Sequence, residues 1–220
     1  MVLARLSLIG WLVSGGAGGL GREIAVLVQQ LNAAGAGWEL RGFCDDRAPA
    51  VPLVAGLPYL GNAAALNTTP EPLAVAVAIG ASAARAAVVR RLTSPQLSFP
   101  ALVHPAVGLT DYQRVALGEG CLIQRGCLLT CDIRLGRFVL LNLGCTVGHD
   151  AVLADFCSLM PQANVSGAAH LETGAYLGAG AVVLPGVRVG AGATLGAGAV
   201  AARDVPAGTT AVGVPARART

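Results

Sequence analysis

Apolar residues recur at every sixth position from Val115 to about Gly198, without a single insertion. Counting in sixes from Val115, the third residue of all fourteen units is aliphatic: Leu117, Ile123, Leu129, Leu135, Leu141, Val147, Leu153, Leu159, Val165, Leu171, Leu177, Val183, Val189 and Leu195. The first residue of each unit is small or β-branched: Val115, Cys121, Cys127, Ile133, Val139, Cys145, Ala151, Cys157, Ala163, Ala169, Ala175, Ala181, Val187 and Ala193. A period of six matches neither an amphipathic helix nor an alternating strand. It is typical of a parallel β-helix of hexapeptides, in which stacked short strands bury one narrow core.

The segment before the repeat has a different pattern, in which apolar strands alternate with helices. In chain order it predicts a strand at Leu6–Val13, a glycine loop at Ser14–Gly21, a helix from Arg22 to about Ala34, strands near Trp38–Cys44 and at Leu73–Ile79, and a helix over roughly Ser82–Leu92. This alternation predicts a small parallel sheet of about three strands covered by helices. Pro100 and Pro105 interrupt the chain just before the repeat. We therefore expect an α/β domain over residues 1–105 and a β-helix domain over residues 106–220.

The glycine loop matches the pattern G-x-G-x-x-G between Gly16 and Gly21, directly after a predicted strand and before a predicted helix. Glycine lets the backbone approach a phosphate, whose charge is favoured by a helix N-terminus. Asp45 and Asp46 end the next strand, where a carboxylate is placed to bond sugar hydroxyls. Three interpretations stay open: a sugar or nucleotide-sugar pocket, a dinucleotide pocket, and a tight turn with only a structural role.

His149 is the residue whose position in the repeat indicates chemistry. It is the fifth residue of its unit, two after the inward Val147, so its side chain is predicted to point away from the core. Asp150 follows it, and a carboxylate bonded to one imidazole nitrogen fixes the tautomer and raises the basicity of the other. That arrangement suits a general base near neutral pH. A plain surface histidine and a buried core histidine are the alternatives.

The surroundings of His149 follow from the coil length. One coil is three hexapeptides, so residues eighteen apart are expected to stack. This count gives two columns of small outward residues: Cys131, Gly167 and Pro185 with His149, and Pro161, Ala179 and Ala197 beside them. Such columns predict a shallow groove in which an extended thioester arm can lie. A general preference of coil corners for small residues would produce the same pattern.

Composition narrows the class of protein. The 220 residues carry a formal net charge of +3 and show no basic patch interleaved with aromatic residues, which argues against a nucleic-acid partner. All fifteen basic residues are arginine, which excludes lysine Schiff-base chemistry in this chain. Four of the six cysteines occupy the small inward position of the repeat, where cysteine acts as a small hydrophobe. We therefore expect a reduced, cytoplasmic protein.

Several other site types are not expected. The longest early uncharged run, Leu6–Gly21, is too short to span a bilayer, so no membrane partner is predicted. Arg5 and the apolar run after it mimic a signal peptide, but the run fits better as the first strand. His104, His149 and His170 lack the close spacing of metal ligands, so no metal site is predicted. No G-x-S-x-G nucleophile elbow occurs, which favours direct attack by the acceptor over an acyl-enzyme.

Several motifs together resemble one enzyme family across nearly the whole chain. They are GAGGLGRE at Gly16–Glu23, GFCDD at Gly42–Asp46, VAIG at Val77–Gly80, LVHP at Leu102–Pro105, LNLGCTVGHD at Leu141–Asp150 and GVPAR at Gly213–Arg217. The sequence is similar to the sugar O-acyltransferases of the sialic acid O-acetyltransferase (NeuD) family, which include PglD-type bacterial UDP-amino-sugar N-acetyltransferases. The resemblance implies a left-handed β-helix, a homotrimer with active sites between neighbouring subunits, and acetyl-CoA as the acyl donor.

The resemblance also implies roles for individual residues. It implies His149 as the catalytic base and Asp150 as the acidic residue that raises its basicity. Acetyl-CoA contacts are implied at Ser158, Gly167, Ala179 and Ala197, with Arg217 near a CoA phosphate. Contacts to the acceptor sugar or its nucleotide are implied at Gly18, Gly19, Leu20, Asp45, Asp46 and Gly80. Three positions depart from the family: many relatives have a second histidine at Ser158, histidine or phenylalanine at Leu20, and glycine at Gln162.

These observations predict an acetyltransferase that moves acetyl from acetyl-CoA directly to an amine or hydroxyl of a sugar, either a UDP-amino sugar or a sialic-acid-like sugar. His149 is the predicted base. Two alternatives belong to other classes: a nicotinamide-dependent oxidoreductase that uses the glycine loop, and a β-helical scaffold without activity. The sequence names neither the sugar nor the pathway.

Overall fold

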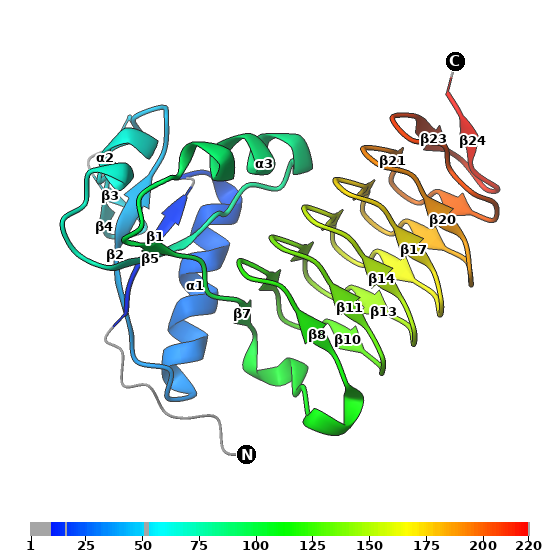
Figure 1. Cartoon of the computed structure of the whole chain (residues 1–220), viewed down its shortest axis with the longest axis horizontal. Coiled ribbons are helices and arrows are strands. Elements are labelled where there is room, and N and C mark those ends of the chain that lie inside the picture. The colour runs from blue at the N-terminus through cyan, green and yellow to red at the C-terminus, as the bar shows by residue number, and fades with distance from the viewer. Residues whose placement is uncertain (1–9, 16, 51–52, 220) are drawn as a thin grey trace.

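The structure is a computed structural model that describes residues 10–15, 17–50 and 53–219. An α/β region at one end joins a long solenoid that ends at the C-terminus (Figure 1). Leu6–Ile9 of the predicted first strand and Gly16 of the predicted glycine loop lie outside the described residues. None of the described helices is long and apolar enough to cross a membrane.

The α/β region contains a four-stranded sheet with the order β2-β1-β5-β6, in which every pair is parallel. Its strands are β1 (Gly10–Gly15), β2 (Trp38–Cys44), β5 (Leu73–Ala76) and β6 (Leu97–Ser98); its helices are α1 (Gly19–Ala33), α2 (Ala63–Asn67) and α3 (Ser82–Arg91); β3 (Leu53–Val54) and β4 (Leu57–Pro58) form a hairpin. The strand predicted at Trp38–Cys44 is confirmed. The first helix begins at Gly19, before the predicted Arg22, and β5 ends before the predicted Ile79.

The two long helices cover opposite faces of this sheet. Ile24 and Leu27 of α1 pack with Ala74 and Ala76, whereas Val88 of α3 packs on the side of Val75. The chain runs from β1 to β2 and later crosses back over β1 to β5, so the strand order reverses beside β1. In open α/β sheets ligands bind at the carboxyl ends of the strands where the order reverses. The carboxyl ends of β1 and β5 therefore mark the crevice of this region.

The solenoid has three faces, each a sheet of strands that are two or three residues long. The covered face contains β7 (Leu102–Val103), β9 (Leu122–Ile123), β12 (Leu140–Leu141), β15 (Ser158–Leu159), β18 (Tyr176–Leu177), β21 (Thr194–Leu195), β23 (Thr210–Val212) and β24 (Arg217–Ala218). The open face contains β10 (Leu128–Leu129), β13 (Thr146–Val147), β16 (Asn164–Val165), β19 (Val182–Val183) and β22 (Val200–Ala201). The arginine face contains β8 (Ala116–Leu117), β11 (Arg134–Leu135), β14 (Val152–Leu153), β17 (His170–Leu171) and β20 (Arg188–Val189). Two single-turn helices, Pro105–Val107 and Asp111–Gln113, join β7 to β8.

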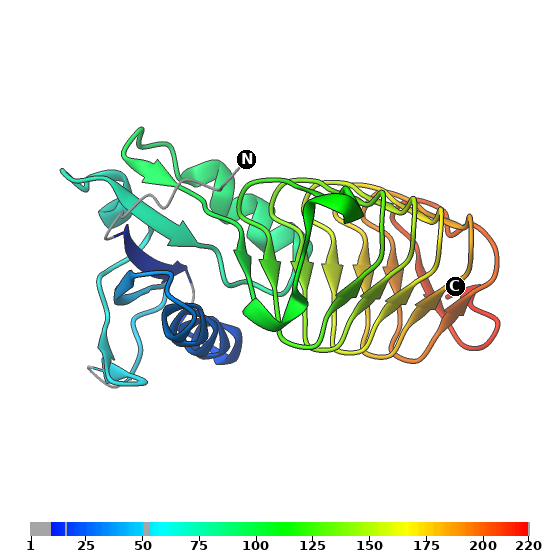
Figure 2. The same ribbon diagram turned by 90° about the horizontal axis from the view of Figure 1, so that it is seen from below.

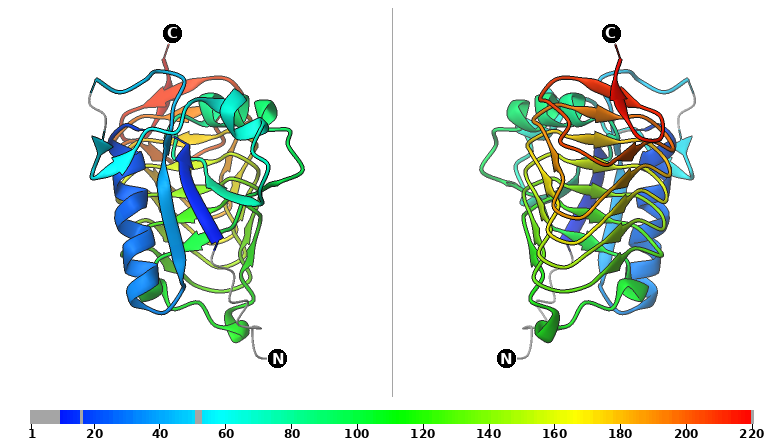
Figure 3. Two further views of the ribbon diagram at one scale, coloured as in Figure 1. Left: turned by 90° about the vertical axis from the view of Figure 1, so that its left-hand side faces the viewer. Right: turned by 90° about the vertical axis from the view of Figure 1, so that its right-hand side faces the viewer.

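The predicted repeat geometry is confirmed. Leu128 pairs with Thr146 and Thr146 with Asn164, so a coil in the body of the solenoid is eighteen residues long. The first pairing, Leu102 with Leu122, spans twenty residues, and the last, Thr194 with Thr210, spans sixteen. Figure 3 shows the coils stacked behind one another in the end-on views. The first and third residues of the hexapeptides form one core cluster, with only Val115 and Leu117 partly buried at its edge.

Glycine recurs in the repeat for two separate reasons. The sixth residue of every unit from Gly120 to Gly198 has a positive φ, a conformation that glycine adopts without strain. At the fourth position, which larger residues occupy in other units, some glycines are required by lack of space: a Cβ on Gly148 would lie 2.6 Å from the Gly167 nitrogen in the next coil. Both constraints come from the tight corners of the coil.

The α/β region packs on the covered face of the solenoid (Figure 2). Leu122 and Leu140 point outward from that face and are buried beneath α1. Phe138 is buried beneath the other side of the sheet, where its ring contacts Phe99 and stacks on Phe156. The N-terminal part of the covered face is thus an internal interface of the chain.

Candidate active site

His149 and Asp150 lie in the turn between β13 and β14, at the corner where the open face meets the arginine face. The Nδ1 atom of His149 is 2.8 Å from Oδ2 of Asp150, and both side chains are more than 60% exposed (64% and 63%). A carboxylate only accepts hydrogen bonds, so Nδ1 of the neutral ring carries the proton and donates it. The second ring nitrogen, Nε2, is then left with a free lone pair.

The imidazole of His149 lies over Gly167 of the next coil. A Cβ built on Gly167 would lie 2.5 Å from Nε2 and 2.7 Å from Cε1 of His149. The ring therefore occupies the space that any other residue at position 167 would fill. This contact also confirms that residues eighteen apart stack at this corner.

Ala179 and Ala197 lie at a different corner from His149. Ala179 follows β18 and Ala197 follows β21, which places both at the corner between the covered face and the open face. The expectation that the two columns border one groove is wrong for a single chain, because the whole open face separates them. The physical reason is that a one-unit step along the chain moves a residue to the next corner of the coil.

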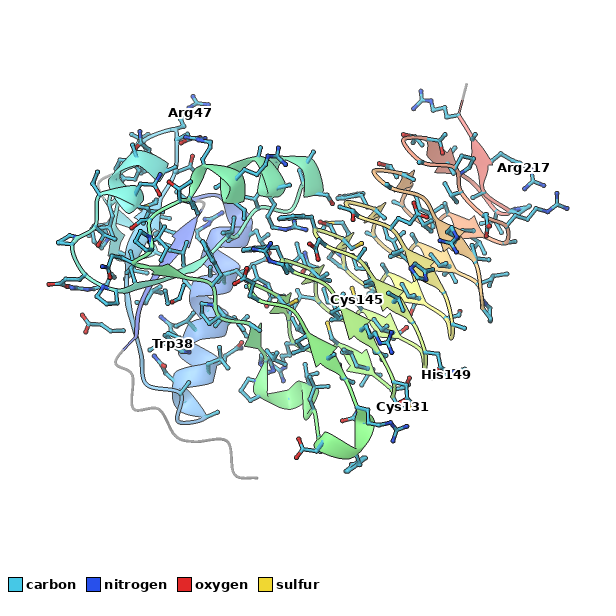
Figure 4. The ribbon with its side chains drawn as sticks, in the orientation of Figure 1. Trp38, Arg47, Cys131, Cys145, His149 and Arg217 are labelled. Carbon is cyan, nitrogen blue, oxygen red and sulfur yellow. The ribbon has the colours of Figure 1, made fainter. Side chains whose placement is uncertain are left out.

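Arg217 lies in β24 at the C-terminal end of the solenoid (Figure 4). It shares a pocket of about 180 Å³ with Arg203. Arg203 was missed by the sequence analysis, although the count of eighteen from His149 leads through Gly167 and Pro185 directly to it. The column that carries the candidate base thus ends at the exposed Arg203, and Arg217 of the covered-face sheet and the carboxylate of Asp204 line the same end pocket.

The candidate acceptor residues gather at the carboxyl edge of the α/β sheet. Gly18 is the N-cap of α1 and Gly19 its first residue, and the helix end has no side-chain cap. An added Cβ at either glycine would meet no atom within 4 Å, so the protein itself does not fill this space. Asp45 ties the loop to β2, because its Oδ2 accepts a hydrogen bond from the Ala17 N–H at 2.9 Å.

Asp46 and Leu20 make contacts within the protein: Asp46 pairs with an arginine and Leu20 packs on the core. Asp46 forms a bidentate ion pair with Arg91 of α3 at 2.6 and 2.9 Å, and the hydrogen bonds from Arg91 lower the pKa of Asp46. Asp45 and Asp46 also line a small pocket of about 100 Å³. Leu20 is only partly buried and packs against the α1 core, which accounts for an apolar residue at this position.

Ser158 does not have the surroundings of a CoA contact. It is fully buried at the junction of the two regions, at 0% exposure. Its hydroxyl donates to the Gly80 carbonyl at 2.8 Å and accepts from Ser82 and Arg85 at 2.9 and 2.8 Å. The implied role at acetyl-CoA needs exposed surface that Ser158 lacks, because the α/β region covers its face of the solenoid.

The candidate base and the candidate acceptor residues are not brought together within one chain. The α/β region packs on the covered face. His149 lies at the opposite corner of the coil, between the open face and the arginine face. Figure 4 shows His149 beside Cys131 on the edge of the coils that points away from the α/β region. No group of three potential metal ligands occurs among the described residues.

Comparisons with known proteins agree with this architecture. Residues 12–92 match the PglD N-terminal domain model. Over 96% of this chain and 97% of the other, the structure is similar to a histidine-to-asparagine variant of perosamine N-acetyltransferase from Caulobacter crescentus in complex with CoA and GDP-perosamine, with 31% identity and a TM-score of 0.84. The acetyltransferase domain of PglB from Neisseria gonorrhoeae FA1090, in complex with acetyl coenzyme A, shares 31% identity over 95% of this chain and 98% of the other, with a TM-score of 0.85.

A third solved structure, WeeI from Acinetobacter baumannii AYE, shares 31% identity over 96% of this chain and 99% of its own, with a TM-score of 0.81. A comparison with curated proteins gives no match. An α/β domain followed by a left-handed β-helix of hexapeptides defines the class, and the predicted fold is confirmed. The chain belongs to the NeuD and PglD type of hexapeptide-repeat sugar acyltransferases.

Proposed function

We propose that the protein transfers acetyl from acetyl-CoA to the amino group of a nucleotide-linked amino sugar. The observation that carries the proposal is the outward His149–Asp150 pair, held at 2.8 Å on the scaffold of a sugar acetyltransferase. A relative of 31% identity was solved with CoA and GDP-perosamine, a nucleotide-linked amino sugar. A sugar hydroxyl as the acceptor is the second candidate of the same class.

In the proposed mechanism Nε2 of His149 accepts a proton from the acceptor amine while the amine nitrogen attacks the thioester carbonyl. Asp150 holds the Nδ1–H and stabilises the imidazolium that forms. The tetrahedral intermediate collapses with cleavage of the C–S bond. The proton then passes from the imidazolium to the departing CoA sulfur, which leaves the amide and free CoA. No acyl-enzyme is needed.

We place the CoA arm along the corner that begins at His149. From His149 the column passes over Gly167 and Pro185 to Arg203, three coils further on. At a spacing of about 4.8 Å per coil this distance is about 14 Å, a span that a stretched pantetheine arm covers. Arg203 and Arg217 share one pocket at the far end, where their guanidinium groups suit the CoA phosphates.

We propose that the active site is completed by a neighbouring chain in a homotrimer. The open face carries exposed leucines: Leu128 on β10, Leu184 after β19, and Leu143 at its edge. Packing open faces together buries these leucines and brings the Ala179 and Ala197 corner of one chain toward the His149 corner of the next. The second chain also supplies the acceptor domain that His149 lacks in its own chain.

We place the acceptor nucleotide at the crevice of the α/β region, against Gly18, Gly19 and Gly80, with Asp45 and Asp46 beside it. The uncapped end of α1 suits a diphosphate, because its free N–H groups and helix dipole favour an anion. All six cysteines are free, which fits a reducing compartment and supports a cytoplasmic location.

The testing experiment is a transfer assay with acetyl-CoA and GDP- or UDP-linked amino sugars, together with calorimetric titration of acetyl-CoA and NADH. We expect acetyl transfer and acetyl-CoA binding without NADH binding. His149→Ala is expected to lower kcat by about 10²- to 10⁴-fold, the usual contribution of a general base. His170→Ala, on the neighbouring arginine face, is the matched control and keeps full activity. Binding of NADH alone would favour an oxidoreductase, and binding of neither would favour a scaffold.

A further inference from the structure

The junction between the two regions is built around one buried arginine. Arg85 lies in the second turn of α3, and its side chain is 1% exposed. Its guanidinium donates to the carbonyls of Ile79 (2.6 Å) and Gly80 (3.2 Å) on one side. On the other side it donates to the carbonyls of Phe138 (2.9 Å), Phe156 (2.9 Å) and Cys157 (3.1 Å), and to Ser158 Oγ (2.8 Å).

This arrangement requires an arginine. Phe138 and Phe156 are eighteen residues apart and belong to successive coils, so the acceptors are spread over two coils and a loop. The planar fork of a guanidinium offers five N–H donors in fixed directions, whereas a lysine ammonium has three on a flexible stem. No carboxylate of the described residues pairs with Arg85. Burial lowers the pKa of Arg85 to about 10, so it keeps its charge at neutral pH.

The loop that Arg85 holds is the loop after β5, which borders the crevice of the α/β region. The Gly80 carbonyl is bonded from two sides, by Arg85 and by the Ser158 hydroxyl. The same loop lines a groove of about 430 Å³ between the start of α3 and the covered face, with Tyr176 and Thr194 on its opposite wall. An added Cβ on Gly80 would meet only Met160 Cε, at 3.9 Å, so the glycine is not required by packing.

We infer that Arg85, together with Ser158, is a positioning residue for the acceptor: it fixes the Ile79–Gly80 loop on the solenoid and thereby sets the shape of the acceptor-binding crevice. The inference rests on the proposed function for its substrate. Arg85 and Ser158 are buried behind the loop, so their effect on acceptor binding passes through the backbone of Gly80. Acetyl-CoA, which we place along the opposite corner of the same chain, is outside their reach.

The test compares Ser158→Ala and Arg85→Lys with Arg90→Lys, an exposed arginine on the same helix. Ser158→Ala removes one hydroxyl and keeps the junction packed, so it remains informative if Arg85→Lys fails to fold. We expect the KM for the nucleotide sugar to rise by about tenfold in both variants, the size of one lost hydrogen bond to a charged group. The KM for acetyl-CoA and kcat stay within about twofold, and Arg90→Lys is unchanged.

Hydrogen exchange gives a readout that does not depend on activity. We expect faster exchange of the amides at 79–84 in Ser158→Ala and Arg85→Lys, with α1 and the distal coils unchanged. Unchanged exchange at 79–84 overturns the inference whatever the wild-type activity is. Equal rises in both KM values with a fall in Tm also overturn it and indicate a purely structural role. Failure of the wild type to acetylate any nucleotide sugar overturns the proposed function instead, and exchange still decides whether Arg85 fixes the loop.

Discussion

The covered and open faces of the solenoid are built from the same hexapeptide and differ in what their outward residues meet. On the covered face the outward Leu140 is buried beneath α1, and the outward Ser158 is fully buried where the α/β region meets the solenoid. On the open face the outward Leu128 is 64% exposed. The repeat determines the core in both cases, and the second residue of each unit determines whether a face becomes an interface.

This difference separates two kinds of interface. The covered face is polar where it meets the α/β region at Ser158, and the hydrogen bonds there fix one arrangement of the two regions. The open face has exposed leucines at its first strand and at its edges, and its centre carries the hydrogen-bonded pair Thr146 and Asn164. Exposed apolar side chains gain free energy when a protein–protein contact buries them. We therefore expect the second interface to form between chains, and the proposed active site to depend on it.

The largest expected effect comes from placing charge on the open face. Leu128→Glu combined with Leu184→Glu buries unpaired carboxylates in the proposed trimer contact, which is strongly unfavourable. We expect sedimentation to show single chains and turnover to fall by about 10²- to 10⁴-fold, as if His149 were absent. Leu53→Glu, an exposed leucine of β3, is the control. A fully active single chain would refute the shared site.

A second effect concerns the His149 corner alone. Gly167→Ala puts a Cβ into the space of the imidazole, so the ring moves and kcat falls by about tenfold to a hundredfold. In a His149→Ala background the same substitution is expected to change nothing further, because no ring is left to displace. Additive losses in the double variant would show that Gly167 acts through something other than His149.

A smaller effect is expected at Arg203, which tests whether the CoA phosphates bind at the far end of the His149 column. Arg203→Ala is expected to raise the KM for acetyl-CoA by about tenfold through loss of a charge-assisted contact to phosphate. With acetyl-pantetheine, which has no nucleotide, the variant and wild type should have the same KM. Arg134→Ala, an exposed arginine on another face, is the control. Equal effects on both donors would place the phosphates elsewhere.

The buried thiols are expected to leave stability unchanged at neutral pH and to lower it only at alkaline pH. Burial raises the pKa of Cys44 and of Cys121 from 9.0 to about 11. Above pH 9 the unfolded chain releases these protons and the folded chain does not, so stability is complete below pH 9 and falls as the pH rises toward 11. Each thiol lowers the free energy of unfolding by about 1.4 kcal/mol per pH unit. Urea unfolding of Cys121→Ala should show a shallower alkaline decline than wild type, and an equal slope would contradict the assignment.

The sequence predicts what depends on local spacing. The inward position of Leu153 and the outward position of His149 both follow from the count of six, because each coil repeats the same backbone path. The contact of His149 with Gly167 follows from the count of eighteen. One further coil of that count would have found Arg203.

What the sequence does not reveal depends on packing between distant segments. Arg85 lies 53 residues from Phe138 and 71 from Phe156, and no spacing links them. Ser158 has the outward phase of a surface residue, and only the docking of the α/β region buries it. The separation of Ala179 from His149 follows from the three-cornered path of the coil, which a linear count of small residues does not show.

The spacing of the coils sets the length of the path that we propose for the CoA arm. Arg203 lies three coils of eighteen residues beyond His149, so the gain or loss of whole coils changes the distance between them only in steps of about 4.8 Å. Insertion or removal of eighteen residues between Gly167 and Arg203 would preserve every inward position and alter only this length. Carriers with longer or shorter arms are thus within reach of the same fold through the gain or loss of one complete coil.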